Sequence, residues 1–482
     1  MASLNGKQIA NLKMEKIAKE GKVLKRGEHI HTWRPRYFIL FEDGTLVGYK
    51  TKPANPGADF LNIFSVKGSQ ITKKNFSGKP GFTLRCLQID AYVDRNFQLE
   101  EDSDRDEWCM QIERIGSKVS AQARIADTTN PDDMSQFTDP SKTKSKITLE
   151  DFELLKVLGK GTFGTVMLSK EKSSGEIFAI KVISKEMIIE KDEIKHTLTE
   201  NKVLQQTKHP FLTGLKYSFQ TKDKLCFVME YVNGGELFFH LSRERRFSED
   251  RSRFYSGEIT LGLEYLHSHK IIYRDLKLEN LLLDQEGHIK LTDFGLCKQD
   301  IAYGDTTSTF CGTPEYLAPE VIEDDSYGLC VDWWSLGVVL YEMICGRLPF
   351  YHQDHDLLFE VILTKPVRFP HDISGKAMSV LEGLLRKDPS QRLGGGKDGP
   401  AEVKSHPFFA SIDWEKLFNK EIDPPFKPKI KSVTDVSYFD TEFTSENPQK
   451  TLAAAPVSTS MGNKMENTFP DFTFVDKDSQ LK

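Results

Sequence analysis

The chain of 482 residues lacks the features of membrane-spanning, secreted and disulfide-built proteins. No apolar run reaches the ~18 residues that a membrane-spanning helix needs, and the N-terminus lacks the apolar core of a signal peptide. Seven cysteines are scattered singly, with neither a CxxC pair nor an even framework, so we expect a reducing cytosolic setting. The net charge of −6 argues against a general nucleic-acid-binding protein.

Basic residues are nevertheless concentrated at one end of the chain. Residues 1–36 carry nine Lys and Arg but only three Asp and Glu. This asymmetry suits the binding of a polyanion. At roughly 100–200 residues per domain, the length predicts two or three domains.

Residues 19–116 are expected to form a first domain made mostly of strands. Two β-rich runs, 37–41 and 46–49, flank a turn signal at 42–45. The period then changes to that of an amphipathic helix, with apolar side chains at Trp108, Ile112 and Ile115.

Several strands followed by one C-terminal helix resemble a pleckstrin-homology domain, a small β-barrel. The resemblance runs through the strings 19–21, 25–28 and 33–38, although Lys22 stands where that family has a tryptophan. In this family, basic residues on the first two strands and their loop bind a phosphorylated inositol ring. The matching positions are Lys25, Arg34 and Arg36, with Arg85 and Asn62 as further contacts. Glu28 sits among these cations and is expected to hold them apart when no ligand is bound. Arginine offers phosphate a planar donor fork and lysine a compact charge; the alternative is that these charges only solvate the barrel rim.

Two stretches outside this domain have a different composition. Residues 117–148 hold ten Ser and Thr and a single aromatic residue, too little apolar surface to offset the entropy of ordering, so they are expected to form a linker. Residues 9–17 alternate apolar side chains with lysines, which fits either a basic helix on a membrane surface or a frayed tail.

Four polar side chains in the second half of the chain have the spacing that phosphoryl transfer to a hydroxyl requires. Asp275 is suited to accept the hydroxyl proton, and Lys277 to neutralise the γ-phosphate as charge moves. Asn280 and Asp293 are hard oxygen ligands suited to Mg²⁺. Asp293 opens an Asp-Phe-Gly triplet, which alone is a weak signal, so the assignment depends on the motifs around it.

A glycine-rich motif, Gly159-x-Gly161-x-x-Gly164, precedes these residues. It lies between two β-rich runs, 154–158 and 165–168, which predicts a strand-turn-strand lid rather than a dinucleotide motif that opens a helix. Its missing side chains let backbone N–H groups approach phosphate oxygens. Lys181 follows as the expected phosphate anchor, and a buried lysine needs an acidic partner.

Together with the Ala-Pro-Glu triplet at 318–320, these motifs resemble the protein kinase signature. By position alone several acids, such as Glu193, can partner Lys181; the resemblance favours Glu200. It also implies a hinge strand whose backbone bonds adenine. The residues expected to bind ATP are Leu158, Gly159, Lys160, Gly161, Thr162, Phe163, Gly164, Thr165, Val166, Lys181, Glu200, Glu230 and Val232.

The chain further resembles the protein kinase B family, also called Akt or RAC kinases, of the AGC group. The resemblance is carried by the string 236–241, by Tyr273 in place of the usual histidine, and by the string 309–320. It implies that an upstream, phosphoinositide-dependent kinase phosphorylates Thr309. The added charge is expected to order the loop against Arg274 and His196.

The tail extends this resemblance. The string 438–443 resembles the segment that lays aromatics beside the nucleotide, and 469–474 resembles a hydrophobic motif that docks on the small lobe. Thr473 is the implied phosphosite of that motif. Thr451 lies near the offset of a third phosphosite, but Leu452 follows it where the family has a proline.

Two further hypotheses concern substrates and oxidation. Glu236, Glu279 and Glu342 are expected to pair with substrate arginines three and five residues before the target hydroxyl; ordinary surface charges or ribose contacts are the alternative. Cys297 and Cys311 flank the activation segment and could join under oxidising stress, against the default of two reduced thiols.

The predicted fold class is therefore multidomain α+β. It comprises a pleckstrin-homology barrel with a C-terminal helix at 19–116, a linker at 117–148, a bilobal kinase domain at 152–409 and an AGC-type tail at 410–482. Within the kinase domain, apolar spacing predicts a helix through 255–266 and a buried helix at 331–344.

The expected function is an ATP- and Mg²⁺-dependent serine/threonine protein kinase of phosphoinositide 3-kinase/Akt signalling. Its expected partners are arginine-rich protein substrates, phosphatidylinositol 3,4,5-trisphosphate and upstream activating kinases, with no nucleic acid and a monomeric state. We expect it in the cytoplasm, recruited to the plasma membrane, with the nucleus as a further location. The alternatives are another AGC-group kinase or a lipid-binding pseudokinase scaffold.

Overall fold

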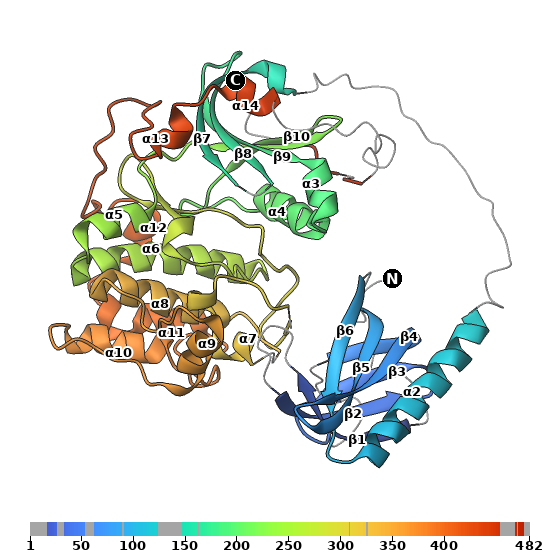
Figure 1. Cartoon of the computed structure of the whole chain (residues 1–482). Helices are drawn as coiled ribbons and strands as arrows, with labels where there is room; N and C mark the ends of the chain where they lie inside the picture. Colours follow the sequence, from blue (N-terminus) through green and yellow to red (C-terminus); the bar gives the residue numbers. More distant parts are fainter. Residues whose placement is uncertain are drawn as a thin grey trace. The chain divides into compact units, whose positions relative to one another are not determined.

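The computed structural model describes residues 17–26, 33–53, 62–88, 91–123, 147–161, 163–307, 309–323, 326–453, 468–469 and 471–476. The chain divides into two compact units, residues 1–142 and residues 143–482 (Figure 1). Within the described ranges, no helix is both long and apolar enough to span a membrane.

The first unit contains a closed barrel of six strands, each pairing with the next in the chain. These strands are β1 (Ile17–Arg26), β2 (Trp33–Phe41), β3 (Thr45–Tyr49), β4 (Asn62–Phe76), β5 (Lys79–Gln88) and β6 (Ala91–Gln98). The barrel closes because β1 pairs antiparallel with both β2 and β6. The predicted turn between β2 and β3 is confirmed: the Gly44 N–H donates to the Phe41 carbonyl at 3.1 Å.

Helix α2 (Asp102–Ala123) follows the barrel and packs into its core. Trp108, Ile112 and Ile115 are at most 3% exposed, which confirms the predicted apolar face. The helix continues seven residues beyond the expected boundary at 116. Gly116 does not stop it; a Cβ there would lie 2.6 Å from the Val66 carbonyl oxygen, so glycine lets the helix pass close to β4.

The second unit begins with a sheet of six strands in the order β14-β10-β11-β9-β8-β7. The strands are β7 (Phe152–Lys160), β8 (Gly164–Glu171), β9 (Ile177–Ser184), β10 (Leu215–Gln220), β11 (Lys224–Glu230) and β14 (Phe474–Val475). Helices α3 (Lys185–Glu190) and α4 (Ile194–Gln206) complete this small lobe. Because β7 pairs with β8 directly across the glycine-rich turn, the predicted strand-turn-strand lid is confirmed.

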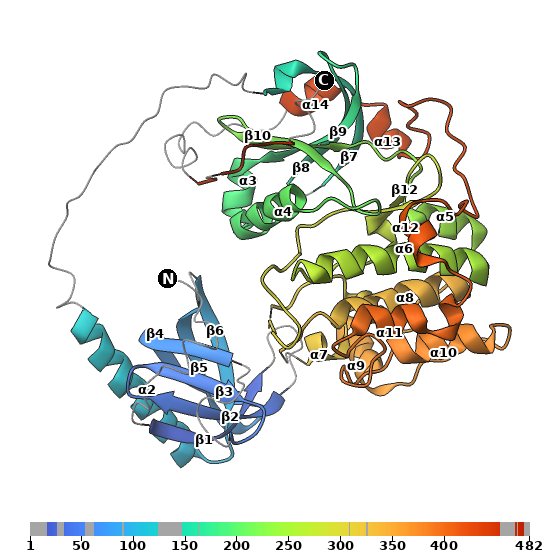
Figure 2. The same cartoon turned by 180° about the vertical axis from the view of Figure 1, so that it is seen from behind.

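Helices dominate the second lobe of this unit, which Figure 2 shows below the sheet. They are α5 (Leu237–Glu244), α6 (Glu249–Ser268), α7 (Pro319–Ile322), α8 (Val331–Cys345), α9 (His355–Thr364), α10 (Gly375–Leu384), α11 (Gly399–Ser405) and α12 (Trp414–Phe418). The short hairpin β12 (Leu281–Leu283) and β13 (Ile289–Leu291) lies among them. The two predicted helices are confirmed as α6 and α8, and α8 is buried at nearly every position.

The tail returns from the large lobe to the small lobe. Helices α13 (Thr441–Thr444) and α14 (Pro448–Ala453) lie against β7, as both views show (Figures 1 and 2). Farther along, β14 adds an edge strand to the sheet by pairing antiparallel with β10. The small lobe is thus bordered by tail segments at both edges of its sheet.

Candidate active site

Asp275 is the centre of a hydrogen-bonded cluster in the loop that leads to β12. Its Oδ2 accepts hydrogen bonds from Lys277 Nζ at 2.9 Å and from Asn280 Nδ2 at 2.8 Å. Its Oδ1 accepts a hydrogen bond from Thr313 Oγ1 at 3.1 Å. The carboxylate is thereby held in one orientation, and only 7% of the residue is exposed. A positioned carboxylate of this kind suits proton acceptance from a nearby hydroxyl.

Thr313 is a member of this cluster that the sequence reasoning did not single out. Its hydroxyl also accepts a hydrogen bond from Lys277 Nζ at 3.0 Å. Thr313 therefore ties the segment after Thr309 to the Asp275 loop. Thr313 belongs to the string 309–320 that carries the family resemblance, and this was the signal that could have singled it out. The sequence alone does not indicate that its side chain points toward Asp275.

Lys181 on β9 pairs with Glu200 on α4. Lys181 Nζ lies 2.6 Å from Glu200 Oε1, as the kinase resemblance implies. Burial alone would lower the pKa of Lys181, but the carboxylates of Glu200 and Asp293 raise it above its ordinary value. Glu193, the alternative partner, instead lies 2.6 Å from the Nδ1 of His196. Lys181 therefore stays positively charged beneath the glycine-rich lid.

A cavity of about 290 Å³ lies between the two lobes. Leu158, Val166 and Ala179 of the small lobe line it, as do the hinge residues Glu230 and Val232. Because the Glu230 N–H donates to the Gly214 carbonyl, only the carbonyl of Glu230 is suited to bond a nucleobase. From the tail, Phe439 reaches the same cavity, with its ring centroid 5.9 Å from that of Tyr231. This confirms the expected aromatic contribution of the tail.

A second cavity, of about 360 Å³, adjoins the first under the lid. Its lining includes Gly161, Gly164, Lys181, Asp275 and Asp293. At Gly161 a Cβ would meet nothing within 4 Å, whereas at Gly164 it would lie 2.0 Å from the Val182 carbonyl oxygen. The first glycine thus leaves room for a ligand, and the second allows β8 to approach β9. Thr162, at the lid's tip, lies outside the described residues.

The oxygen donors in this cavity and next to it fit a divalent cation that is shared with phosphate. Asn280 donates its NH₂ group to Asp275, so its amide oxygen is the atom suited to a metal. Asp293 has an exposed carboxylate and a φ of 59°. Within the described ranges no group of three or more His, Cys, Asp or Glu could hold a metal alone. A cation here therefore needs oxygens from a bound phosphate as well.

Comparisons with known proteins agree with this geometry. The protein kinase domain family matches residues 152–409, the PH domain family residues 17–117, and the protein kinase C terminal domain family residues 430–474. The RAC serine/threonine-protein kinase of Drosophila melanogaster is 52% identical over 484 residues, covering 95% of this chain and 79% of the relative. The RAC-beta serine/threonine-protein kinase of Homo sapiens is 54% identical over 442 residues, covering 89% and 92%.

The chain belongs to the RAC serine/threonine-protein kinases. It is a pleckstrin-homology barrel followed by a bilobal protein kinase with its C-terminal extension. A protein kinase domain uses ATP and a divalent metal ion and acts on protein substrates. The pleckstrin-homology domain of this RAC kinase indicates recruitment to membranes.

The three predicted substrate glutamates of this RAC kinase have different surroundings. Glu236 and Glu279 both line the nucleotide cavity. Glu342 of α8 accepts a hydrogen bond from the Tyr316 hydroxyl at 2.7 Å. Burial, reinforced by Glu279 and opposed by Tyr316, raises the pKa of Glu342 to about 7. Burial and the neighbouring Glu279 also raise the pKa of Glu236, so negative charge is crowded here.

Three of the predicted lipid-site cations share one face of the barrel. Lys25 lies opposite Arg34 on the neighbouring strand, and Val23 lies opposite Arg36. Directly opposed residues of antiparallel strands point to the same face, and Val23 belongs to the barrel core. The three cations therefore lie on the inner face, beyond the apolar core. Their arrangement is that of a charged barrel mouth.

The other three predicted lipid-site residues are placed differently. Arg85 is exposed between the buried Leu84 and Cys86, which puts it on the opposite, outer face of β5. Glu28 and the side chain of Asn62 lie outside the described residues. Arg85 thus does not share the face of Lys25, contrary to the single group of cations expected from the sequence.

Thr309 is exposed, and its carbonyl accepts a hydrogen bond from the Tyr327 hydroxyl. Arg274 Nη1 donates to that same hydroxyl at 3.1 Å. Lys298, which sequence reasoning missed, directly follows Cys297, whose carbonyl accepts a hydrogen bond from Arg274 Nη2 at 3.5 Å. Burial, together with the charges of Lys195 and Arg274, lowers the pKa of Lys298. Cationic side chains thus gather behind the loop that carries Thr309.

The hydrophobic motif docks on the small lobe as expected. Phe469 and Phe472 are buried, and the Phe472 ring centroid lies 5.1 Å from that of Phe227. The Phe472 carbonyl accepts hydrogen bonds from Asn201 Nδ2 at 2.9 Å and Ser218 Oγ at 2.6 Å. The neighbouring hydroxyl, that of Thr473, is exposed.

Cys297 and Cys311 are free thiols in the structure. Burial raises the pKa of each above its ordinary value. Thiol–disulfide exchange proceeds through the thiolate, so a raised pKa slows it. The oxidative link between them stays a hypothesis.

Proposed function

We propose that this kinase transfers the γ-phosphoryl group of Mg·ATP in line to serine and threonine hydroxyls. Asp275 orients the substrate hydroxyl and accepts its proton, and Lys277 neutralises charge on the transferred group. Asn280 and Asp293 would hold Mg²⁺, which supplies charge neutralisation when bound. Lys181, kept in place by Glu200, would hold the nucleotide phosphates. The observation that carries this proposal is the hydrogen-bonded cluster around Asp275.

Single-turnover kinetics of D275N, D293N and the unchanged protein test this mechanism. D275N is expected to lose most of kcat while still binding nucleotide, because it removes the proton acceptor. D293N is expected to weaken binding of Mg·ATP as well. Both variants should keep lipid binding, which depends on a separate domain. Substantial turnover of D293N would overturn the metal assignment.

Activation is proposed to require phosphate at Thr309. A phosphate adds roughly −1.5 to −2 charge, and it would meet the cationic region of Arg274 and Lys298. Besides burial, the charges of Lys195 and Arg274 act on Lys298, and cations that lie close together gain from a nearby anion. His196 is a weaker candidate than the sequence implied, since its Nδ1 lies beside Glu193.

Phosphorylation at Thr473 is proposed as a second activating event. The exposed hydroxyl follows an anchored, buried Phe472, so a kinase could modify it while the aromatic anchors stay in place. Thr451 remains a weaker candidate: its hydroxyl already donates to the Glu446 carboxylate at 2.7 Å, and Leu452 follows it.

Recruitment is proposed to depend on a 3-phosphorylated inositol lipid, phosphatidylinositol 3,4,5-trisphosphate, bound by Lys25, Arg34 and Arg36. Several cations on one inner face suit a polyphosphorylated ring. Binding would bring the kinase from the cytoplasm to the plasma membrane, where upstream kinases reach Thr309, within phosphoinositide 3-kinase signalling. The preference for substrate arginines is proposed to rest on Glu236, Glu279 and Glu342.

A further inference from the structure

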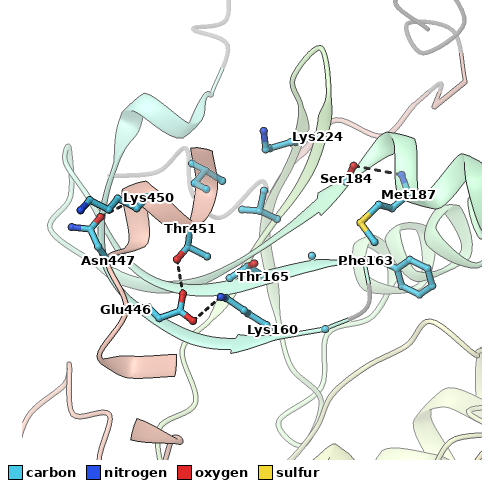
Figure 3. Close-up of a pocket in the computed structure, with 14 residues that line it drawn as sticks. Lys160, Phe163, Thr165, Ser184, Met187, Lys224, Glu446, Asn447, Lys450 and Thr451 are labelled. Atoms are coloured by element: carbon cyan, nitrogen blue, oxygen red, sulfur yellow. Dashed lines mark hydrogen bonds and ion pairs between the residues drawn. The ribbon is translucent and has the colours of Figure 1, made fainter. Parts of the chain in front are cut away.

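The carboxylate of Glu446 joins the tail to the nucleotide lid. Its Oε1 lies 2.6 Å from Lys160 Nζ, at the end of β7 (Figure 3). Its Oε2 accepts a hydrogen bond from the Thr451 hydroxyl of α14 at 2.7 Å. One carboxylate thus bridges the lid strand and the tail helix α14, whose Thr451 lies five residues farther along.

The segment around Glu446 is held in place independently of that bridge. The Thr451 N–H donates to the Asn447 carbonyl, and the Glu446 N–H to that of Phe443, each at 3.0 Å. Leu452 packs against the apolar cluster of the small-lobe sheet. These contacts place the backbone of Glu446 against the small lobe, within reach of Lys160.

Lys160, the lid residue of this bridge, lies at the start of the glycine-rich turn, whose backbone must be ordered to bind the nucleotide phosphates. Lys160 stands between Gly159 and Gly161, and the Gly161 N–H donates to the Gly164 carbonyl across the turn at 2.9 Å. Glycines give a backbone many conformations. A charge contact at Lys160 restricts that freedom at the start of the turn.

The same tail meets the lid region from the nucleotide side seven residues earlier. Phe439 lines the nucleotide cavity, whereas Glu446 and Thr451 line a separate cavity of about 560 Å³ on the lid together with Lys160 and Thr165 (Figure 3). The tail therefore contacts the lid at two separate cavities.

We infer that Glu446 is a positioning residue for the kinase reaction: through Lys160 it holds the glycine-rich lid in the conformation that binds the ATP phosphates. The anionic group that joins the tail to the lid is thus a carboxylate of the chain and not an added phosphate. Thr451 supports this carboxylate through its hydroxyl, so this contact forms without phosphate on Thr451. A phosphate on Thr451 would compete with Glu446 for the same lysine.

The expected size of the effect follows from the exposure of the pair. The Lys160 and Glu446 side chains are 41% and 30% exposed, so the contact is partly screened by water. Exposed ion pairs change an equilibrium by about one- to fivefold. E446Q should accordingly raise KM for ATP by about two- to fivefold, with a smaller change in kcat. High salt should narrow the difference from the unchanged protein.

The experiment compares full-length proteins that carry equal phosphate at Thr309, verified by intact mass. E442Q is the matched control, because Glu442 is an exposed carboxylate on α13 of the same tail. The inference expects E442Q to match the unchanged protein. Equal KM values for E446Q and the unchanged protein, or equal rises in E446Q and E442Q, would overturn it.

A charge exchange separates the contact from a general effect on tail folding. K160E should raise KM for ATP as E446Q does, and K160E/E446K should recover much of the loss, since the opposite charges meet again. Hydrogen exchange over residues 441–453 gives an independent readout. Absence of recovery in the exchanged pair, with the tail still protected, would contradict the role of Glu446.

Discussion

Asp332 of α8 fixes the backbone at Arg274. Its Oδ1 accepts the Arg274 N–H at 2.9 Å, and its Oδ2 accepts the Tyr273 N–H, also at 2.9 Å. Arg274 has a φ of 69°, a conformation that non-glycine residues adopt at a cost. A buried carboxylate thus imposes a strained turn on the residue directly before Asp275.

The first prediction concerns this carboxylate. In D332N one acceptor oxygen becomes an NH₂ group that cannot accept a backbone N–H. Losing a hydrogen bond to a charged group costs about 1.5–3 kcal/mol, so kcat is expected to fall roughly tenfold or more, with KM for ATP changed less. D372N is the control, since Asp372 pairs with Arg246 at the exposed surface. Calorimetry must accompany the kinetics: a variant that loses stability but keeps kcat would refute a role in positioning.

The second prediction tests activation. T309A should remain poorly active after treatment with an upstream kinase, because no phosphate can reach Arg274 and Lys298. Two charge-assisted hydrogen bonds at about 1.5–3 kcal/mol each imply a loss of kcat/KM of roughly a hundredfold or more. T306A, an exposed threonine of the same loop, should behave like the unchanged protein. Peptide phosphorylation rates before and after treatment give the answer, and similar activation of both variants would contradict the assignment.

The catalytic core was predictable from sequence because phosphoryl transfer fixes residue types at fixed offsets. Asp275, Lys277 and Asn280 lie within six residues, so one loop brings them together. Thr313 escaped prediction because it lies 38 residues beyond Asp275, and only the fold shows that its hydroxyl contacts that carboxylate. Lys298 escaped for the same reason.

The sequence also failed to predict on which face of a strand a side chain lies, where a helix ends, and which distant residues come into contact. The sequence grouped Arg85 with Lys25, but strand alternation places it on the outer face, and only the register of the barrel reveals this. The predicted domain ended at 116, yet Gly116 lies inside the helix, where its small size allows a close approach to β4. Glu446 went unnoticed because nothing local distinguishes a carboxylate that will contact a lysine 286 residues away.

The third prediction concerns the docked hydrophobic motif. Asp476 follows β14, and its Oδ1 lies 2.9 Å from Lys208 Nζ. D476N should loosen this edge strand and lower activity by up to about fivefold, as expected for a partly exposed ion pair. Asp471 gives the control: its φ of 57° suits asparagine equally well, so D471N should keep full activity. Faster hydrogen exchange at 474–476 in D476N alone would support the contact, and identical exchange in both variants would argue against it.

The fourth prediction is a pH dependence of substrate recognition. A carboxyl group with a pKa near 7, as at Glu342, is ionised above that pH and neutral below it. Pairing with arginine requires the ionised form, so KM for an arginine-bearing peptide should rise as pH falls from 8 to 6. E342Q should flatten this profile, and a peptide with alanine in place of arginine should show little dependence. An unchanged profile in E342Q would assign recognition to Glu236 and Glu279 instead.

The last prediction concerns membrane recruitment by the barrel mouth. Removing Arg36 leaves phosphate charge without its donor fork, and a charge-assisted hydrogen bond contributes about 1.5–3 kcal/mol. R36C should therefore lose roughly tenfold or more of its affinity for vesicles that carry phosphatidylinositol 3,4,5-trisphosphate, whereas E28K, which adds a cation, should bind more tightly. R114C is the matched control, because Arg114 pairs with Glu42 from the exposed face of α2. Vesicle pelleting with and without the phosphorylated lipid separates specific binding from general charge attraction.

In cells R36C should stay in the cytosol with Thr309 unmodified, yet an already phosphorylated R36C kinase should keep its activity toward peptides. Pelleting of R36C equal to that of the unchanged protein would refute the lipid site and leave the kinase assignment intact, since the barrel and the kinase domain are separate compact units.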